Sequence, residues 1–480
     1  MSRINTNTSS ILASRQLANS QSLLQQSLER LSSGLRINRG ADDPAGLIIS
    51  QNLRSEVEGV RQAISNSQRA SNVIATTEGA LSEVASLLND IQAKIVEAAN
   101  VGAVSDDEIK ANQLQIDSAV ASITRIANTT TFGGRKLLNG SLGYITSGVN
   151  NNNVTDIAIH GISFGTADYI PVTINVTQSA QHGELQFATS SVTQNVTIEV
   201  AGPKGVNTLS LLGGTTASAI LTAINLVSDA TGVSASLINP ANANSGIRLL
   251  SQEFGSAAFV QVSELGSSFG AFTTQDSVGS LVKRDEGRDT AATINGAQSL
   301  GKGLNLSLNN TGLSIELKLQ ESFNTAGTTS FAITGGGASF QLGPGVDSNQ
   351  QVNIGVQSTA ASRLGNGTVG FLSDVASGGA YSLVNGQAKN AGAIIKEAIT
   401  QVSVLRGRLG AFEKNTVDTN INQLRITLEN LTSAESTIRD LDFATETSSL
   451  TRAQILVQAG TSVLATANAT PQTVLALLRQ

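Results

Sequence analysis

Cysteine is absent from the 480-residue sequence, histidine occurs only twice, and charged residues make up only 14% of the chain. The absence of cysteine excludes disulfides, thiol catalysis and cysteine-ligated metals, and it leaves the redox compartment open. The formal net charge of −6 provides no basic field that would attract phosphate backbones or anionic lipid. We therefore expect no nucleic-acid partner.

Long hydrophobic runs are also absent. No segment reaches the apolar length needed to span a bilayer. The first residues, MSRINTNTSSILASRQ, are polar and lack the apolar centre of a signal peptide. We expect no membrane insertion, and any export would use a route other than the general secretory one.

Catalytic motifs are present only as fragments. His182 and Glu184 form H-x-E, but a zinc deaminase also needs cysteine ligands. Gly365, Gly367 and Gly370 spell GxGxxG, without the acidic residue about 20 positions later and the βαβ unit of a dinucleotide site. His160, the other histidine, belongs to no HExxH helix. We predict a loop at the glycines, no catalytic residue, no cofactor and no metal site.

Aromatic residues divide the chain into zones. None precedes Phe132, and only Phe412 and Phe443 follow Tyr381. The middle zone also holds Pro171, Pro203, Pro240 and Pro344, four of the six prolines. This distribution predicts a mostly β middle region inserted into a frame of another composition.

The first zone has helical periodicity. One seam predicts a helix over residues 4–33, roughly 45 Å long at 1.5 Å per residue, and it comprises Leu17, Leu24, Leu28, Leu31 and Leu35. From Val60 to Ala98 apolar or small residues recur in alternating steps of three and four, which is typical of a coiled coil. A third helix is expected after Ser105, where SDDE suits a capped start.

The last zone mirrors the first. A seam runs from Ile395 to Phe412, slips in phase, and resumes from Val417 to Leu431. The final seam comprises Leu450, Ala453, Val457, Leu464, Ala467, Val474 and Leu478. Pro471 lies within this segment and predicts a kink or an early end of the helix, because proline cannot donate to the Ala467 carbonyl.

The middle zone alternates apolar and polar residues between Gly, Asn and Pro, as half-buried strands do. The clearest segments are YIPVTINVT, NVTIEVAG, LNLSLNN, LSIELKLQ and QVNIGV. Residues 216–227 form the one convincing helix within it. We predict one or two small, mostly β subdomains.

The stretch SSGLRINRGADDPAGLIIS, residues 32–50, separates the first two helices. Gly34 and Gly40 can take left-handed conformations, Asp42 or Asp43 can cap the next helix, and Pro44 suits its first position. These five residues predict a helix–loop–helix joint between domains.

The two terminal helices carry few charges. Before Leu28 the only charged residues are Arg3 and Arg15, and after Leu450 they are Arg452 and Arg479. Such helices depend on packing for stability, so we expect them to pair and to bury their remaining surfaces against other copies of the chain. The predicted assembly interface is Leu24, Leu28, Leu31, Leu35, Leu450, Val457, Leu464, Val474 and Leu478.

The sequence resembles a bacterial flagellin at both ends. The resemblance is carried by LERLSSGLRINRGADDPAGLIIS (residues 28–50), TTEGALSEV (76–84) and FATETSSLTRAQILVQAGTSVLATANATPQTVLALLR (443–479). ATINGAQSL from Ala292 and FQLGPGVDSNQQVNIGV from Phe340 are more weakly similar. The resemblance at the two ends covers roughly the first 140 and last 95 residues.

The resemblance implies an α + β multidomain fold, with long coiled-coil-like helices from both termini packed together and a mostly β insertion. Mapped onto this chain, residues 1–43 with 440–480 form the terminal core domain, 44–140 with 385–439 a helical bundle domain, and 141–384 the outer variable region. The joint at residues 32–50 would then connect two layers of a tubular filament.

The resemblance also implies function and partners. The chain would be a structural subunit that self-assembles into the extracellular flagellar filament for swimming. It would be exported unfolded by the flagellar type III apparatus, polymerise as a homopolymer beneath cap proteins and next to hook-junction proteins, and bind an export chaperone through its C-terminal helix.

One departure from the family concerns detection by the vertebrate innate receptor. The stretch NDIQAKIV, residues 89–96, resembles QRVRELAV in detected flagellins, with Asp90, Gln92 and Ala93 at the altered positions. Loss of two cations and reversal of a charge should weaken a charge-assisted interface. We predict poor activation.

Two other hypotheses compete with the hypothesis that the chain is a filament subunit. A hook–filament junction protein belongs to the same family, but usually resembles flagellin less at the extreme C-terminus. A secreted adhesin-like protein would use the β insertion to bind glycans or surfaces, and would bind as a monomer without polymerising.

Overall fold

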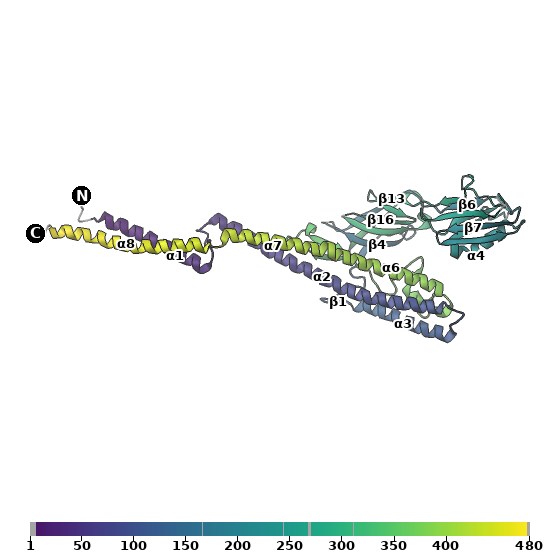
Figure 1. Cartoon of the computed structure of the whole chain (residues 1–480), viewed down its shortest axis with the longest axis horizontal. Helices are drawn as coiled ribbons and strands as arrows, with labels where there is room; N and C mark the ends of the chain where they lie inside the picture. The colour runs from purple at the N-terminus through teal and green to yellow at the C-terminus, as the bar shows by residue number, and fades with distance from the viewer. Residues whose placement is uncertain (1–5, 166, 243, 267–269, 311, 478–480) are drawn as a thin grey trace. The chain divides into compact units, whose positions relative to one another are not determined.

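The computed structural model describes residues 6–165, 167–242, 244–266, 270–310 and 312–477 (Figure 1). The chain divides into two compact units. Unit 1 comprises residues 1–70, 341–346 and 414–480, and unit 2 comprises residues 71–340 and 347–413.

Unit 1 is helical. Its elements are α1 (Thr8–Ser33), the first part of α2 (Pro44–Ala98), α7 (Asp418–Arg439) and α8 (Phe443–Leu477). Helices α1 and α8 lie side by side. The first part of α2 packs on α7 through buried Val60, Ala63 and Leu424, so the paired terminal helices predicted from the sequence are confirmed.

Helix α8 continues through Pro471 to Leu477. Of the two effects predicted for this proline, the early end is therefore wrong, and the kink stays a prediction. The physical reason lies across the helix pair. The Ala467 carbonyl, which a proline four residues later cannot satisfy, accepts a 2.7 Å hydrogen bond from the Asn7 side-chain amide. The same Asn7 side chain caps α1 by accepting a bond from the Ser10 N–H. The predicted start at Ile4 lies outside the described residues.

The helical part of unit 2 contains the rest of α2, then α3 (Asp106–Thr129) and α6 (Ala388–Phe412). Ser105 and Glu108 form the capping box that starts α3. Along α2 the predicted seam is buried at Ala70, Ile74, Thr77, Leu81, Val84, Leu88, Ile91, Ile95 and Ala98.

The predicted phase slip is visible as a π-helical segment, Glu413–Val417, between α6 and α7. A π-turn accommodates one extra residue, so the five-residue step from Phe412 to Val417 keeps apolar residues on one face.

Unit 2 also holds two β lobes with separate hydrophobic cores. β lobe A contains a five-stranded sheet, β14-β13-β5-β18-β3, and a four-stranded sheet, β15-β16-β17-β4. Its strands are β3 (Tyr144–Ser147), β4 (Val154–Ile162), β5 (Ile170–Gln178), β13 (Ala291–Ile294), β14 (Ala297–Gln298), β15 (Leu300–Lys302), β16 (Asn305–Asn309), β17 (Leu313–Leu319) and β18 (Gly327–Gly336). The inward residues of both sheets, among them Ile174 and Ile315, form its core.

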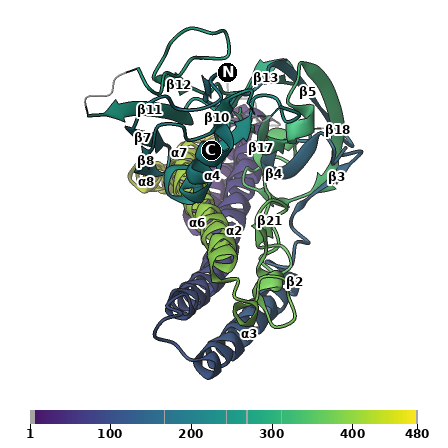
Figure 2. The same cartoon turned by 90° about the vertical axis from the view of Figure 1, so that its right-hand side faces the viewer.

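β lobe B contains the sheets β6-β10-β9 and β12-β11-β7-β8. Its strands are β6 (Glu184–Phe187), β7 (Val196–Gly202), β8 (Gly205–Leu211), β9 (Val233–Leu237), β10 (Ile247–Ser251), β11 (Phe259–Leu265) and β12 (Arg284–Glu286). Helix α4 (Ala217–Leu226), followed by the short α5 (Ser228–Thr231), lies against these strands (Figure 2).

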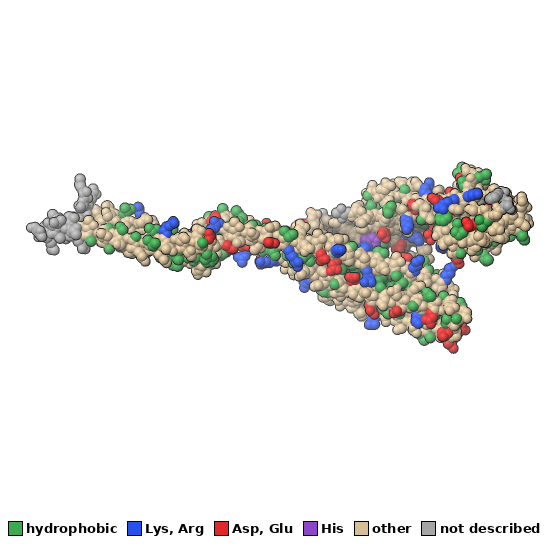
Figure 3. Space-filling view, in the orientation of Figure 1, with side chains coloured by type: hydrophobic (Ala, Val, Ile, Leu, Met, Phe, Trp, Pro, Cys, Tyr) green, Lys and Arg blue, Asp and Glu red, His purple; other side chains and the backbone are tan. Residues whose placement is uncertain are grey.

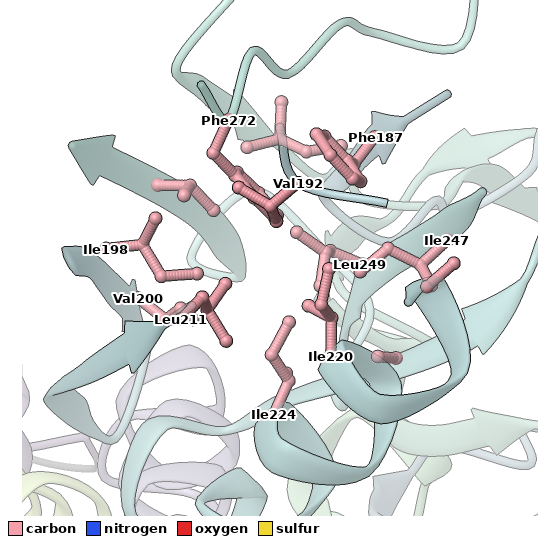
Figure 4. Close-up of a cluster of buried hydrophobic side chains, with 14 of the residues drawn as sticks. Phe187, Val192, Ile198, Val200, Leu211, Ile220, Ile224, Ile247, Leu249 and Phe272 are labelled. Atoms are coloured by element: carbon pink, nitrogen blue, oxygen red, sulfur yellow. The ribbon is translucent and has the colours of Figure 1, made fainter. Parts of the chain in front are cut away.

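The core of β lobe B combines an aromatic stack with aliphatic side chains of α4. The rings of Phe187 and Phe272 stack with centroids 4.1 Å apart. Ile220 and Ile224 project from α4 into the same buried cluster as Leu249 (Figure 4). An amphipathic helix on a sheet thus gives this lobe its own core.

The remaining short elements are β1 (Thr131–Phe132) with β2 (Arg135–Lys136), β19 (Ala338–Gln341) with β20 (Gln351–Ile354), β21 (Gly365–Asn366) with β22 (Gly370–Phe371), and 3₁₀ turns at Glu321–Phe323, Ser348–Gln350, Leu372–Val375 and Leu383–Asn385. All five predicted strand segments and the predicted helix after Thr216 are confirmed. The GxGxxG segment is a hairpin, with Gly365 and Gly370 at φ 109° and 104°.

No helix in the described part of the chain is both long and apolar enough to cross a membrane. Among the same residues, no group of three or more His, Cys, Asp or Glu side chains is placed to hold a metal ion.

Candidate assembly surface

The contact between α1 and α8 is antiparallel. Near one end Ser10 Oγ lies 2.7 Å from Asn468 Oδ1, and near the other Arg30 Nη1 lies 3.7 Å from Glu446 Oε2. Between them Leu17 packs on Gly460, where an added Cβ would lie 3.2 Å from Leu17 Cδ1. Residues later in α1 therefore pair with residues earlier in α8.

Each helix alternates a large and a small residue along this contact. On α1 the residues are Ala13, Leu17, Ser20, Leu24, Ser27 and Leu31, and on α8 they are Leu450, Ala453, Val457, Gly460, Leu464 and Ala467. The register given by Leu17 and Gly460 places the large residues of one helix opposite small residues of the other. This interdigitation lets the two helices approach closely.

Eight of the nine predicted interface residues fall into three groups. Leu24, Leu31, Leu450, Val457 and Leu464 are half-buried along the contact. Leu35 forms an isolated β-bridge with Asp440. The Leu478 position and the Val474 side chain lie outside the described residues.

Leu28 differs from its expected place on the α1 seam. Its side chain is 50% exposed, because the contact uses Ser27 and Leu31 instead. The regular heptad phase runs through the small residues Ala13, Ser20 and Ser27, which are the buried residues of α1. Counting leucines alone missed this phase.

Large apolar side chains of this helix pair face solvent in the single chain. In the described part of α1 and α8 the exposed ones are Ile11, Leu12, Leu23, Leu28, Phe443, Ile455, Leu456 and Val463. Figure 3 shows hydrophobic side chains with few charged ones between them along this helical stretch. Exposed apolar surface of this extent marks an interaction surface.

The joint between α1 and α2 is fixed by backbone pairing. Gly34 ends α1 at φ 72°, and its carbonyl accepts a 3.0 Å bond from the Leu441 N–H. The Arg36 N–H donates to the Arg439 carbonyl at 2.8 Å. Ile37 is only 1% exposed. The joint therefore holds the end of α7 and the start of α8 as well as the two helices it connects in sequence.

Two adjacent carboxylates shape the turn itself. Asp43 Oδ1 accepts a 2.9 Å bond from the Gly46 N–H and caps α2. Asp42 Oδ2 accepts bonds from the N–H groups of Asn38 and Arg39 at 3.1 and 2.9 Å. The hydrogen bond from the Arg39 backbone is the largest influence on the pKa of Asp42, which lies below its ordinary value.

The glycines of the joint have different roles from those expected. Gly34 has a positive φ, whereas Gly40 does not take the left-handed conformation, and that part of the prediction was wrong because the Asp42 bonds close the turn. Gly46, which the sequence left without a role, is buried; an added Cβ would lie 2.4 Å from Asp43 Oδ2. Pro44 occupies the first position of α2, as predicted.

The three positions altered in the receptor-like segment lie on α2 in unit 2. Asp90 and Ala93 are exposed, and they line a surface groove shared with α3 residues such as Gln115 and Ser118. Gln92 is half-buried, and its Oε1 makes no hydrogen bond to the described residues.

Comparisons with known proteins agree with the geometry of both helical ends. Residues 4–142 match the bacterial flagellin N-terminal helical region, residues 393–478 match the C-terminal helical region, and residues 195–247 in β lobe B match the flagellin hook IN motif. A flagellin of Salmonella rubislaw is 31% identical over 506 residues, covering 99% of both chains. The chain belongs to the flagellin family.

A second relative supports this assignment. The B-type flagellin of Pseudomonas aeruginosa is 32% identical over 503 residues, again covering 99% of each chain. Among solved structures, a flagellar cap protein from Escherichia coli has a TM-score of 0.29 at 19% identity, covering 47% of this chain and 63% of its own.

Flagellins are structural subunits of the extracellular bacterial flagellar filament. The chain is accordingly a filament protein and not an enzyme. The surface of α1 and α8, rather than a pocket, is therefore its candidate functional site.

Proposed function

We propose that the surface formed by α1 and α8 packs against other copies of the chain as the core of the filament. The observation that supports this most directly is the burial pattern. In the described part of the two helices only Ala13, Ser20, Ser27, Glu446 and Ala453 are buried. With no large apolar side chain fully buried, pairing alone stabilises these helices weakly, and neighbouring copies would cover the exposed leucines and isoleucines.

The predicted domain division gives each part a place in such a filament. Residues 1–43 with 440–480 would form the core, residues 44–140 with 385–439 the surrounding helical layer, and residues 141–384 the outer region. The joint at residues 32–50 would connect the first two layers. The joint has backbone hydrogen bonds to residues 439 and 441, and the carboxylates of Asp42 and Asp43 accept hydrogen bonds within its turn. Both features suit a fixed connection that transmits load.

Further partners follow from the flagellin assignment. We infer that growth of the homopolymer involves cap and hook-junction proteins and that an export chaperone binds the C-terminal helix. The exposed apolar residues of α8, such as Ile455 and Leu456, are the surface a chaperone would cover before assembly.

Seeded polymerisation tests the proposed core surface. Leu28→Asp changes a side chain that is 50% exposed in the single chain, so the monomer should fold normally. In the filament the carboxylate would be buried without a partner, at a cost of several kcal/mol. We expect no filaments by electron microscopy after seeding.

The matched control is Val206→Asp in β8, where the valine is 59% exposed. This variant should polymerise like the unmodified chain. Normal filaments from Leu28→Asp would contradict the proposed surface, and failure of both variants would show that the method does not isolate the core.

A further inference from the structure

A partly buried polar cluster joins helix α6 to β lobe A within unit 2. Arg408, in the last part of α6, is half-buried, and its Nη2 donates a 2.7 Å hydrogen bond to the backbone carbonyl of His160 on β4. A charge-assisted bond of this kind, partly shielded from water, is a strong point of attachment. It is formed between segments 248 residues apart in sequence.

The His160 ring lies in this contact, and its two nitrogen atoms have few polar partners there. Its side chain is 14% exposed, and Nε2 lies 3.4 Å from Glu316 Oε2 on β17. Neither ring nitrogen makes a hydrogen bond to the described residues. Glu316 is itself 61% exposed, so water weakens its attraction for a proton on the ring.

The third strand in the cluster supplies a neutral group. Tyr144 on β3 has a buried hydroxyl without a hydrogen-bond partner among the described residues. Its ring packs on Gly337 and Gly355, where an added Cβ would lie 2.7 and 2.4 Å from ring carbons. Burial raises the pKa of Tyr144 to about 12, so this group keeps its proton throughout the physiological range.

The charged and titratable groups that act on His160 are therefore Arg408 from α6 and Glu316 from β17. Burial, and then the charge of Arg408, hold the pKa of His160 below its ordinary value, and Glu316 opposes them. Arg408 stays charged at any physiological pH. Of the groups in the cluster, His160 is the one that changes charge as a neutral solution becomes mildly acidic.

We propose that His160 makes the attachment of β lobe A to α6 sensitive to acid, because a proton on its ring places a second cation near the half-buried guanidinium of Arg408. At neutral pH the ring is uncharged, the Arg408 bond to the His160 carbonyl persists, and the lobe is held. In mild acid the two cations repel each other and the ring draws in water. The lobe then loosens from the helix while its own core persists.

The sign of the effect follows from proton linkage. In the loosened state His160 has an ordinary pKa near 6.5, above that of the attached state. The attachment is therefore fully stable above about pH 6.5, and it weakens as pH falls through that value toward the lower pKa of the attached state.

Nuclear magnetic resonance of the full-length chain with isotope-labelled histidine tests the starting point directly. The chain contains only two histidines, and His182→Gln assigns the two signals. We expect the His160 signal to titrate below pH 6.5, the ordinary value for histidine. Titration at or above pH 6.5 overturns the proposal, whether or not any variant folds.

Loosening is measured by the distance between two spin labels. Because the chain lacks cysteine, Ser330→Cys on β18 and Ser403→Cys on α6 introduce the only labelling sites, both at exposed positions. We expect the distance distribution to broaden between pH 7.5 and 5 in this pair. Adding His160→Phe, which keeps a ring but cannot be protonated, should remove the broadening.

Two outcomes of this measurement overturn the proposed acid sensitivity of the attachment. One is an unchanged distribution in acid, and the other is equal broadening with and without His160→Phe. His182→Gln in the same labelled chain should behave like the parent, since that residue lies in a different contact.

Discussion

Single side chains complete backbone hydrogen bonding where the regular helix cannot. Asn7 is the clearest case, since one amide caps α1 and also satisfies the Ala467 carbonyl opposite Pro471. In the joint, the Asp42 carboxylate accepts hydrogen bonds from the backbone N–H groups of residues 38 and 39. These residues are recognisable as capping types in the sequence, but their partners are hundreds of positions away or depend on the turn, so sequence alone does not identify them.

Replacing Asn7 by Ala should therefore weaken both helices of the pair at once. Loss of an N-cap side chain costs about 1 kcal/mol, and the Ala467 carbonyl would lose its partner as well. We expect filaments of Asn7→Ala to depolymerise at a lower temperature than those of Ser9→Ala, the control on an exposed neighbour. Light scattering during heating measures this, and equal temperatures would show that the bond contributes nothing in the assembly.

The receptor positions give a second prediction at this scale. Asp90 and Ala93 are exposed on α2, so substitutions there should leave the fold intact. The monomer should activate the vertebrate innate receptor weakly in a cell reporter assay, and the triple change Asp90→Arg, Gln92→Arg, Ala93→Glu should strengthen the response. Full activation by the unmodified chain would disprove the inference.

At the scale of elements, the seam periodicity was the most informative part of the sequence. It predicted the buried face of α2 and the irregularity between Phe412 and Val417, which the structure shows as a π-helical segment. It was less informative for α1, where burial follows Ala13, Ser20 and Ser27 rather than every leucine. Small residues are buried where a partner helix approaches closely, and hydrophobicity alone does not mark them.

The π-helical segment predicts a difference between two deletions. Removing Asn415, which is exposed, should convert the π-turn into regular α-helix and keep the following seam on its face. Removing Arg425 from α7 should rotate Leu428 and Leu431 by about 100° away from their contact with α2. Thermal unfolding followed by circular dichroism should show the greater loss for the second deletion; the opposite order would mean that the π-turn itself is required.

At the scale of the whole molecule, helical ends of weak intrinsic stability accompany lobes with complete cores. β lobes A and B bury aromatic and aliphatic side chains on their own, whereas α1 and α8 leave most of theirs exposed. Stability is thus unevenly distributed along the chain. In the proposed filament this arrangement leaves burial of the ends to contacts between copies.

Limited proteolysis of the dilute monomer should therefore remove residues from both ends and leave a middle fragment that contains the β lobes. The same protease should leave the ends intact in assembled filaments, since neighbouring copies would cover them. Mass spectrometry of the products identifies the cut sites. Ends that resist digestion in the monomer would contradict the proposed role of assembly.

The sequence by itself determined the helical ends, their seams, the β character of the middle region and the family, because periodicity and motif residues are local properties. Tertiary structure alone decided that β5 pairs with β13 and β18, that the middle region has two cores, and that Leu28 lies outside the contact between α1 and α8. It also decided that Asn7 satisfies Ala467 and that His160 lies beside Arg408. Each of these depends on groups distant in sequence meeting in space, and no local pattern specifies which partners meet.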